Sequence, residues 1–121
     1  MKITVHNYNE KSIAQVVSSS PLITDTQSAL DLLMDVSYNH QSNLIVINKE
    51  AVAEDFFILS TGMAGEILQK FVNYHVKFAV YGDFSIYTSK ALKDFIYECN
   101  KGKHIFFAKD LDEAVEMIAA D

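Results

Sequence analysis

The chain has 121 residues, of which 50% are apolar and 21% are charged, and its formal net charge is −6. This composition excludes an intrinsically disordered chain and predicts one globular domain over residues 1–121. The sequence is acidic overall and contains no stripe of basic residues, which argues against nucleic acid as a partner. No apolar run is long enough for a membrane helix, and the single Cys99 cannot form an intramolecular disulfide. We therefore expect a cytoplasmic protein that makes no membrane contact.

The first third of the chain predicts a β-hairpin followed by a helix. Two alternating runs, 3–5 and 13–17, flank the polar segment 7–11, as two antiparallel strands flank a turn. Thr24 and Gln27 have the spacing of a capping box, so a helix is expected to begin near Asp25. Apolar side chains three or four residues apart continue this helix: Ala29, Leu30, Leu33 and Val36.

The rest of the chain alternates between short apolar runs and helical stripes. The apolar runs predict strands that are covered on both faces, and they span residues 44–47, 78–81 and 105–107. The stripes predict helices around residues 67–72, 92–99 and 111–118. Residues 49–59 are compatible with a short helical turn or with a loop. The order ββαβαβαβα predicts an α/β fold with a mixed sheet, in which an N-terminal hairpin precedes helices alternating with parallel strands.

Polar residues are expected to meet where the parallel strands end. Ligands of open α/β sheets bind outside the carboxyl ends of the strands, and the loops after all three predicted inner strands reach that edge. With the helix that follows Ser60, these loops form a candidate anion-binding or ligand-binding rim: Lys49, Ser60, Gly62, Asp83, Ser85 and Lys109. Two lysines and a helix N-terminus can hold an anion. Loops and caps are also polar in any globular protein, and this alternative stays open.

The most informative stretch is Ser60-Thr61-Gly62, which stands at the predicted start of a helix. The first N–H groups of a helix are unpaired and carry a partial positive charge. A hydroxyl at this position can cap the helix, help to bind an anion, or carry a phosphate.

No catalytic set or cofactor site stands out. Ser60 lacks the G-x-S-x-G surroundings of an exposed nucleophile, and Cys99 is expected to be an inert thiol inside a helix. The four histidines are scattered, so no metal site is predicted: His6, His40, His75 and His104. Gly62 and Gly65 form only G-x-x-G, which is insufficient for nucleotide binding. We expect no metal, no cofactor and no enzymatic activity.

Aromatic residues gather around the helix predicted at 92–99. Tyr87 and Tyr97 are candidates for a partner surface, because tyrosine is enriched at interfaces. The alternative is that their rings lie at the edge of the core and only the hydroxyls reach solvent. Outward aromatics would also suit a self-associating subunit, and the sequence leaves the oligomeric state open.

The element order and the segment 59–65 together resemble the STAS domain, the module shared by sulphate transporters and bacterial anti-sigma-factor antagonists. The chain also resembles a family of small uncharacterised bacterial proteins over nearly its full length. Antagonists carry an acid-Ser-Ser/Thr-Gly-apolar-Gly motif after the buried strand. Here Ser60, Thr61 and Gly62 match it, whereas Leu59 replaces the acid and Gly65 stands one place late.

The resemblance implies a STAS-like fold and a function in protein interaction. In the family, the first serine of the motif is phosphorylated by a partner anti-sigma factor that is also a kinase. It therefore implies Ser60 as the phosphorylated position, with Thr61 beside it, and an anti-sigma-factor-like kinase as the partner. Our leading hypothesis is an interaction module switched at Ser60. The alternative is a small-molecule binder or enzyme that uses the rim.

Overall fold

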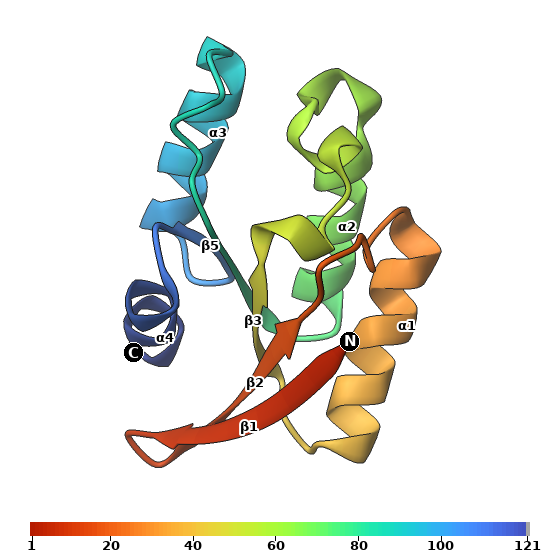
Figure 1. Ribbon diagram of the computed structural model, residues 1–121, viewed down its shortest axis with the longest axis vertical. Helices are drawn as coiled ribbons and strands as arrows, with labels where there is room; N and C mark the ends of the chain where they lie inside the picture. Colours follow the sequence, from red (N-terminus) through yellow and green to blue (C-terminus); the bar gives the residue numbers. More distant parts are fainter. Residues whose placement is uncertain (121) are drawn as a thin grey trace.

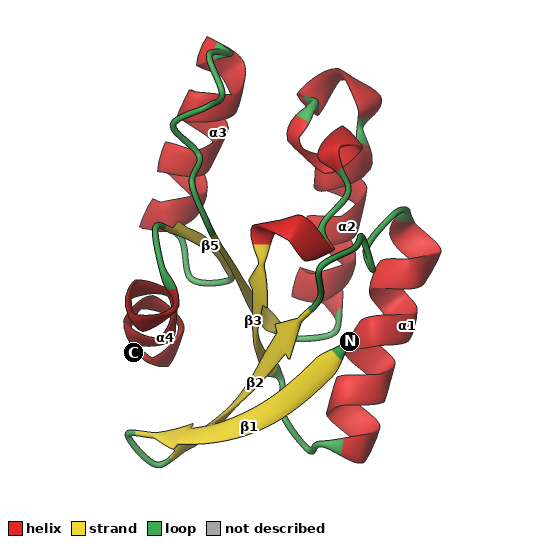
Figure 2. Ribbon diagram, viewed as in Figure 1, coloured by secondary structure: helices red, strands yellow, loops and turns green. Residues whose placement is uncertain are grey.

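A computed structural model of the chain describes residues 1–120, which contain one five-stranded sheet (Figures 1 and 2). The strands are β1 (Lys2–Tyr8), β2 (Lys11–Val17), β3 (Leu44–Asn48), β4 (Lys77–Tyr81) and β5 (Ile105–Ala108). They lie side by side in chain order. β1 and β2 pair antiparallel, and every later neighbour pairs parallel. This confirms the predicted mixed sheet with an N-terminal hairpin.

Four α-helices cover the sheet unequally. They are α1 (Thr26–Asn39), α2 (Met63–Asn73), α3 (Lys90–Lys101) and α4 (Leu111–Ala119). Right-handed crossovers between strands in sequential order place α1, α2 and α3 on the same face. α4 covers the opposite face over β3, β4 and β5 (Figure 1). The order of the strands and α-helices is the predicted ββαβαβαβα.

Strand alternation divides the apolar side chains between two cores. The larger core lies under α1, α2 and α3, and the smaller one lies under α4. In the larger core, Phe71 of α2 meets Phe78 of β4 edge to face, with ring centroids 4.6 Å apart. Both side chains are fully buried. This contact fixes α2, and with it the segment that precedes α2, against the centre of the sheet.

The start of α1 corrects one detail of the sequence prediction. The capping box uses Asp25 and Ser28 rather than Thr24 and Gln27. The Asp25 carboxylate accepts from the Ser28 backbone N–H at 2.7 Å, and the Asp25 N–H donates to the Ser28 hydroxyl at 3.1 Å. The helix begins at Thr26, close to the predicted position. Because Asp25 adopts the extended conformation of an N-cap, its side chain takes the role assigned to Thr24.

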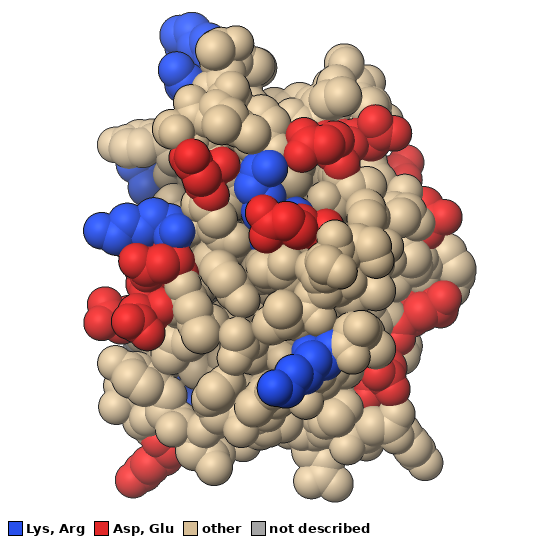
Figure 3. All heavy atoms as spheres, viewed as in Figure 1, with Lys and Arg blue, Asp and Glu red and all other residues tan. Residues whose placement is uncertain are grey.

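The surface carries charges of both signs. On the face shown in Figure 3, lysine side chains are scattered among carboxylates and form no basic patch. Among residues 1–120, no helix has the length and apolar character that crossing a bilayer requires.

Candidate functional site

The segment after β3 consists of three consecutive 3-10 turns, which settles the alternative left open for residues 49–59. The turns are η1 (Lys49–Ala51), η2 (Glu54–Phe57) and η3 (Leu59–Thr61). An isolated parallel bridge between Ile23 and Val52 holds this segment to the chain before α1. The Ala53 N–H donates to the Ile23 carbonyl at 2.9 Å. The segment 49–61 is therefore held in place by backbone hydrogen bonds at the edge where the carboxyl ends of the parallel strands lie.

Gly62 separates this segment from α2. Its φ of +77° lies in the left-handed region that favours glycine, and α2 begins at Met63. The Thr61 hydroxyl lies 2.9 Å from the carbonyls of Asp55 and Ile58, and it accepts from the Met63 N–H at 3.2 Å. The N-cap of α2 is Gly62, so no side chain caps the helix from that position, and the hydroxyl that bonds the start of α2 belongs to Thr61, one residue earlier.

Ser60 lies on η3, and Thr61 and Gly62 separate it from Met63, the first residue of α2. Its side chain is exposed and makes no hydrogen bond with residues 1–120. Phosphorylating Thr61 would break the contacts of its hydroxyl, whereas phosphorylating Ser60 would break none. Of the two predicted phosphorylation positions, Ser60 is therefore the one that the local structure leaves available.

A groove of about 450 Å³ runs beside Ser60, between η3 and the loop before α3. Ile58 on one side is 50% exposed, and Ile86 on the other is 62% exposed. Ser89 also lines the groove and caps α3 by accepting from the Leu92 N–H at 3.2 Å. The groove thus combines exposed aliphatic side chains with hydroxyls near a helix start.

Lys49, the first residue of the predicted rim, is held in a cage of carboxylate and aromatic groups. Its ammonium lies 3.3 Å from the Glu54 carboxylate, and only 11% of its side chain is exposed. It lies 5.1 Å from the ring centroid of Tyr87 and 5.6 Å from that of Phe57, within the range of cation–π attraction. Gly82 lies against the Lys49 stem so closely that a Cβ at Gly82 would stand 2.7 Å from the Lys49 Cβ.

The cage also sets the protonation of its members. Burial by itself lowers the pKa of Lys49, but the neighbouring Tyr87 and Glu54 outweigh it, and the net pKa is raised. Burial raises the pKa of the Tyr87 hydroxyl, which donates to the Glu54 carboxylate at 3.0 Å. Lys49 is therefore cationic and Tyr87 neutral at physiological pH, and the ammonium is already matched by its own carboxylate.

Three further rim residues, Asp83, Ser85 and Lys109, lie around a hollow of about 410 Å³ between the ends of β4 and β5. The Asp83 carboxylate accepts from the hydroxyl and the N–H of Ser85, and these bonds lower its pKa. The Lys109 ammonium lies 4.0 Å from the Glu113 carboxylate. Asp83, Ser85 and Lys109 thus share one hollow, whereas Ser60 faces a different groove. Because Lys49 and Lys109 each have a carboxylate partner, an added anion would compete with both partners.

The two candidate interface tyrosines have different surroundings. Tyr87 is half-buried and stacks on Phe57, with ring centroids 5.2 Å apart. Tyr97 is exposed on α3, and the Lys101 ammonium lies 4.3 Å from its ring centroid. Tyr87 therefore supports the core edge with its ring, and of these two candidates it is Tyr97 that presents its ring to solvent.

Cys99 is half-buried on α3, and burial raises its pKa to about 11. Since the thiolate is the reactive form, we expect alkylation of the folded protein at neutral pH to be on the order of 100-fold slower than that of an ordinary thiol. Timed iodoacetamide labelling followed by mass spectrometry measures the rate. The same chain in urea is the control and should react at the ordinary rate. Equal rates in the folded and unfolded protein would contradict the prediction.

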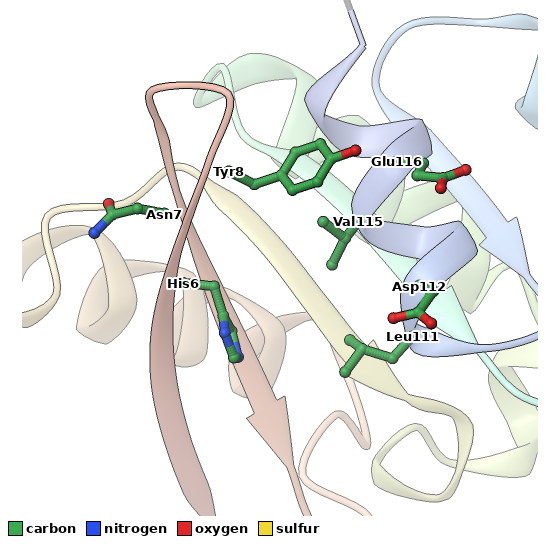
Figure 4. A pocket seen from close by; sticks show the side chains of 7 residues that line it. All are labelled: His6, Asn7, Tyr8, Leu111, Asp112, Val115 and Glu116. Carbon is green, nitrogen blue, oxygen red and sulfur yellow. The ribbon is translucent and has the colours of Figure 1, made fainter.

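A second hollow, of about 370 Å³, lies between the hairpin and α4 (Figure 4). Figure 4 shows Tyr8 directed toward α4 and Asn7 directed to the other side of the hairpin. The hollow has a mixed lining, with Val115 and Glu116 on the side of α4. Within residues 1–120, no group of three His, Cys, Asp or Glu side chains could hold a metal ion.

Sequence reasoning missed the residues that give the groove and the cage their character. Ile86 is an isolated aliphatic residue in a polar segment, whereas Ile58 stands in the apolar run 56–59, which is typical of a buried segment. Neither pattern indicates an exposed side chain. Glu54 is one of 16 acidic residues, and nothing in the sequence marks it as the partner of Lys49. An isoleucine among turn-forming residues, as at Ile86, is the one sequence feature that could have indicated an exposed apolar patch.

Comparison with known proteins gives a structural neighbour and a family. No curated protein sequence matches the chain. A crystal structure of a provisionally assigned anti-sigma factor antagonist from Thermotoga maritima is similar, with a TM-score of 0.48 and 15% sequence identity; the match covers 98% of this chain and 95% of that one. The family model described as a domain of unknown function, DUF4180, matches residues 8–118, and the chain therefore belongs to that family.

Proposed function

We propose that this chain is a protein-interaction module that binds a protein partner through the groove beside Ser60, and that phosphorylation of Ser60 controls this binding. The observation that carries the proposal is the position of Ser60. Its exposed hydroxyl makes no hydrogen bond within the described residues, and it lies at a groove flanked by Ile58 and Ile86. The proposed action is binding rather than catalysis.

The exposed isoleucines support a protein partner. Ile58 and Ile86 come from segments far apart in the chain, and neither belongs to the two buried cores. Aliphatic side chains gathered beside polar groups are typical of protein-binding surfaces. A partner that covers this groove would remove both isoleucines from water while contacting the hydroxyls of Ser60 and Ser89.

The surroundings of Ser60 also suit a phosphate. A phosphoserine adds about −1.5 to −2 charges at neutral pH. The N-termini of α2 and α3 are both near the groove and carry partial positive charge, so the fold would tolerate the added charge. The phosphate would repel an acidic contact face, and an apolar contact face would strip water from the phosphate without replacing its hydrogen bonds. A kinase of the anti-sigma-factor type would serve as both partner and modifying enzyme in this scheme.

The proposal is tested by comparing the wild type with Ser60→Asp and Ser60→Ala. We expect Ser60→Asp to weaken partner binding about tenfold or more, because charge enters the apolar groove, and Ser60→Ala to bind normally. Quantitative pull-downs from the native cytosol, followed by titration of the recovered partner, measure the difference.

Ser37→Asp is the matched control for that experiment. Ser37 is also an exposed serine, but it lies on α1, away from the groove. The same charge should leave binding unchanged there. Normal partner recovery with Ser60→Asp would refute the switch. Equal loss of binding with Ser60→Asp and Ser37→Asp would also refute it, because the effect would then come from overall charge.

A further inference from the structure

β1 is the outermost strand of the sheet, and its outer backbone edge pairs with none of the described residues, 1–120. The strand is seven residues long and pairs with β2 alone, and no described element lies beyond it (Figure 2). The opposite edge strand, β5, has four residues, which are buried between α3 and α4. A long open edge is a template for pairing with another strand.

The pairing of β2 shows which backbone groups of β1 face outward. The Ser12 carbonyl accepts from the Ser42 hydroxyl at 2.8 Å, and the Ser18 N–H donates to the Asn48 side chain at 3.0 Å. Both contacts lie on the side of β3, so even-numbered residues of β2 direct their backbone groups toward β3. Because successive residues alternate, odd-numbered residues of β2 face β1.

The register carries this alternation over to β1. Odd-numbered residues of β2 pair with even-numbered residues of β1, as Gln15 does with Thr4. The even-numbered residues of β1 therefore direct their backbone groups inward to β2. The N–H and C=O groups of Ile3, Val5 and Asn7 face solvent.

This edge lacks the features that normally prevent strand pairing. β1 contains no proline, and its register with β2 is continuous over all seven pairs, so no bulge twists it away. Its central residue is Val5, which is 40% exposed. Edge strands are usually protected by a central charge, a proline or a bulge.

We propose that two copies of this chain pair antiparallel through β1, which joins their sheets into one. Overlap of the full strand places Val5 across a two-fold axis from the partner subunit's Val5. Ile3 then lies beside the partner subunit's Asn7, and the three outward-facing residues of each copy exchange about six backbone hydrogen bonds. The interface is isologous, as in most homodimers.

Charge complementarity favours a second copy over an unrelated strand. In the full-overlap register, Lys2 lies opposite the partner subunit's Tyr8, the last residue before the hairpin turn that carries the partner subunit's Glu10. Each end of the interface thus places a long lysine side chain next to a turn that carries a glutamate, and opposite charges there attract. Neither Lys2 nor Glu10 has an ion-pair partner among residues 1–120 of its own chain.

Sedimentation velocity of the intact protein across a dilution series tests the dimer. We expect a reversible monomer–dimer equilibrium in the wild type. Val5→Glu places two carboxylates opposite each other at the axis and should raise the dimer dissociation constant at least about tenfold. Ile86→Glu is the matched control: it adds the same charge at another exposed aliphatic residue, in the groove beside Ser60, and should leave dimerisation unchanged.

Charge reversal distinguishes a second copy from other occupants of the edge. Lys2→Glu and Glu10→Lys should each weaken the dimer, and the double variant should restore it. A monomer at every concentration, a dimer insensitive to Val5→Glu, or a double variant as weak as the single ones would overturn the proposal. Binding of an unrelated extended peptide at β1 without self-association would also overturn it. The outcome is independent of the groove beside Ser60, because the two surfaces share no residue.

Discussion

Replacing Phe71 by alanine is expected to lower the free energy of unfolding by about 3–5 kcal/mol, the range for a fully buried phenylalanine. Phe71 is 0% exposed, and its ring meets Phe78 of β4 edge to face. Removing the ring leaves a cavity between α2 and the centre of the sheet, and the aromatic contact is lost as well. Since a domain is stable by only about 5–15 kcal/mol, this one change should remove a large part of the total.

Urea unfolding measures this loss as a lower midpoint with an unchanged slope. Tyr74→Ala is the control, because Tyr74 is the exposed residue that ends α2. It should change the free energy of unfolding by no more than about 0.5 kcal/mol. Equal effects of the two substitutions would mean that the contact between Phe71 and Phe78 does not hold α2 in place.

Replacing Gly82 by alanine is expected to lower the free energy of unfolding by about 3 kcal/mol, through overpacking and backbone incompatibility. The added Cβ would stand 2.7 Å from the Lys49 Cβ, which is fixed to the backbone and cannot swing away. The Gly82 N–H also donates to the Ala108 carbonyl at 3.0 Å, which limits how far the loop can move. The expected consequence is a shift of Lys49 and disruption of its cage.

Gly65→Ala provides an internal comparison with the opposite sign. Gly65 lies in α2, and a Cβ there meets nothing within 4 Å. Alanine should raise the free energy of unfolding by about 0.5–1 kcal/mol, because glycine is a poor helix former. Thermal or urea unfolding of both variants measures the two changes in the free energy of unfolding, which we expect to be a decrease for Gly82→Ala and an increase for Gly65→Ala. A neutral Gly82→Ala would show that the backbones of β3 and β4 can separate at this point without cost.

The sequence predicted the elements of the fold because each one follows from local pattern. Alternation marked the hairpin, and continuous apolar runs marked the inner strands that became β3, β4 and β5. The helix starts also use short-range chemistry: Ser89 accepts from the Leu92 N–H, and Asp110 accepts from the Glu113 N–H. Local spacing erred only where adjacent candidates compete, as Thr24 and Asp25 do at the start of α1.

The candidate site was predicted less completely, because its contacts join distant segments. The residues of the predicted rim do lie after the strands, but they divide between a hollow at Asp83 and Lys109 and a groove at Ser60. Lys49 is a candidate anion-binding residue by sequence, and its pairing with Glu54 depends on how the 3-10 turns fold back over the edge. Sequence spacing contains no information about that path.

The sequence alone determined the element order, the apolar face of each helix and strand, and the place where α2 begins, because periodicity and turn chemistry act within a few residues. The tertiary structure decided that the Ser60 hydroxyl is left free while the Thr61 hydroxyl bonds to the backbone, that Lys49 is enclosed, and that β1 has an open edge. Each of these depends on which segments meet in space. These contacts arise from long-range packing between the loop before α3, the 3-10 turns and the sheet. Short-range sequence patterns do not predict them.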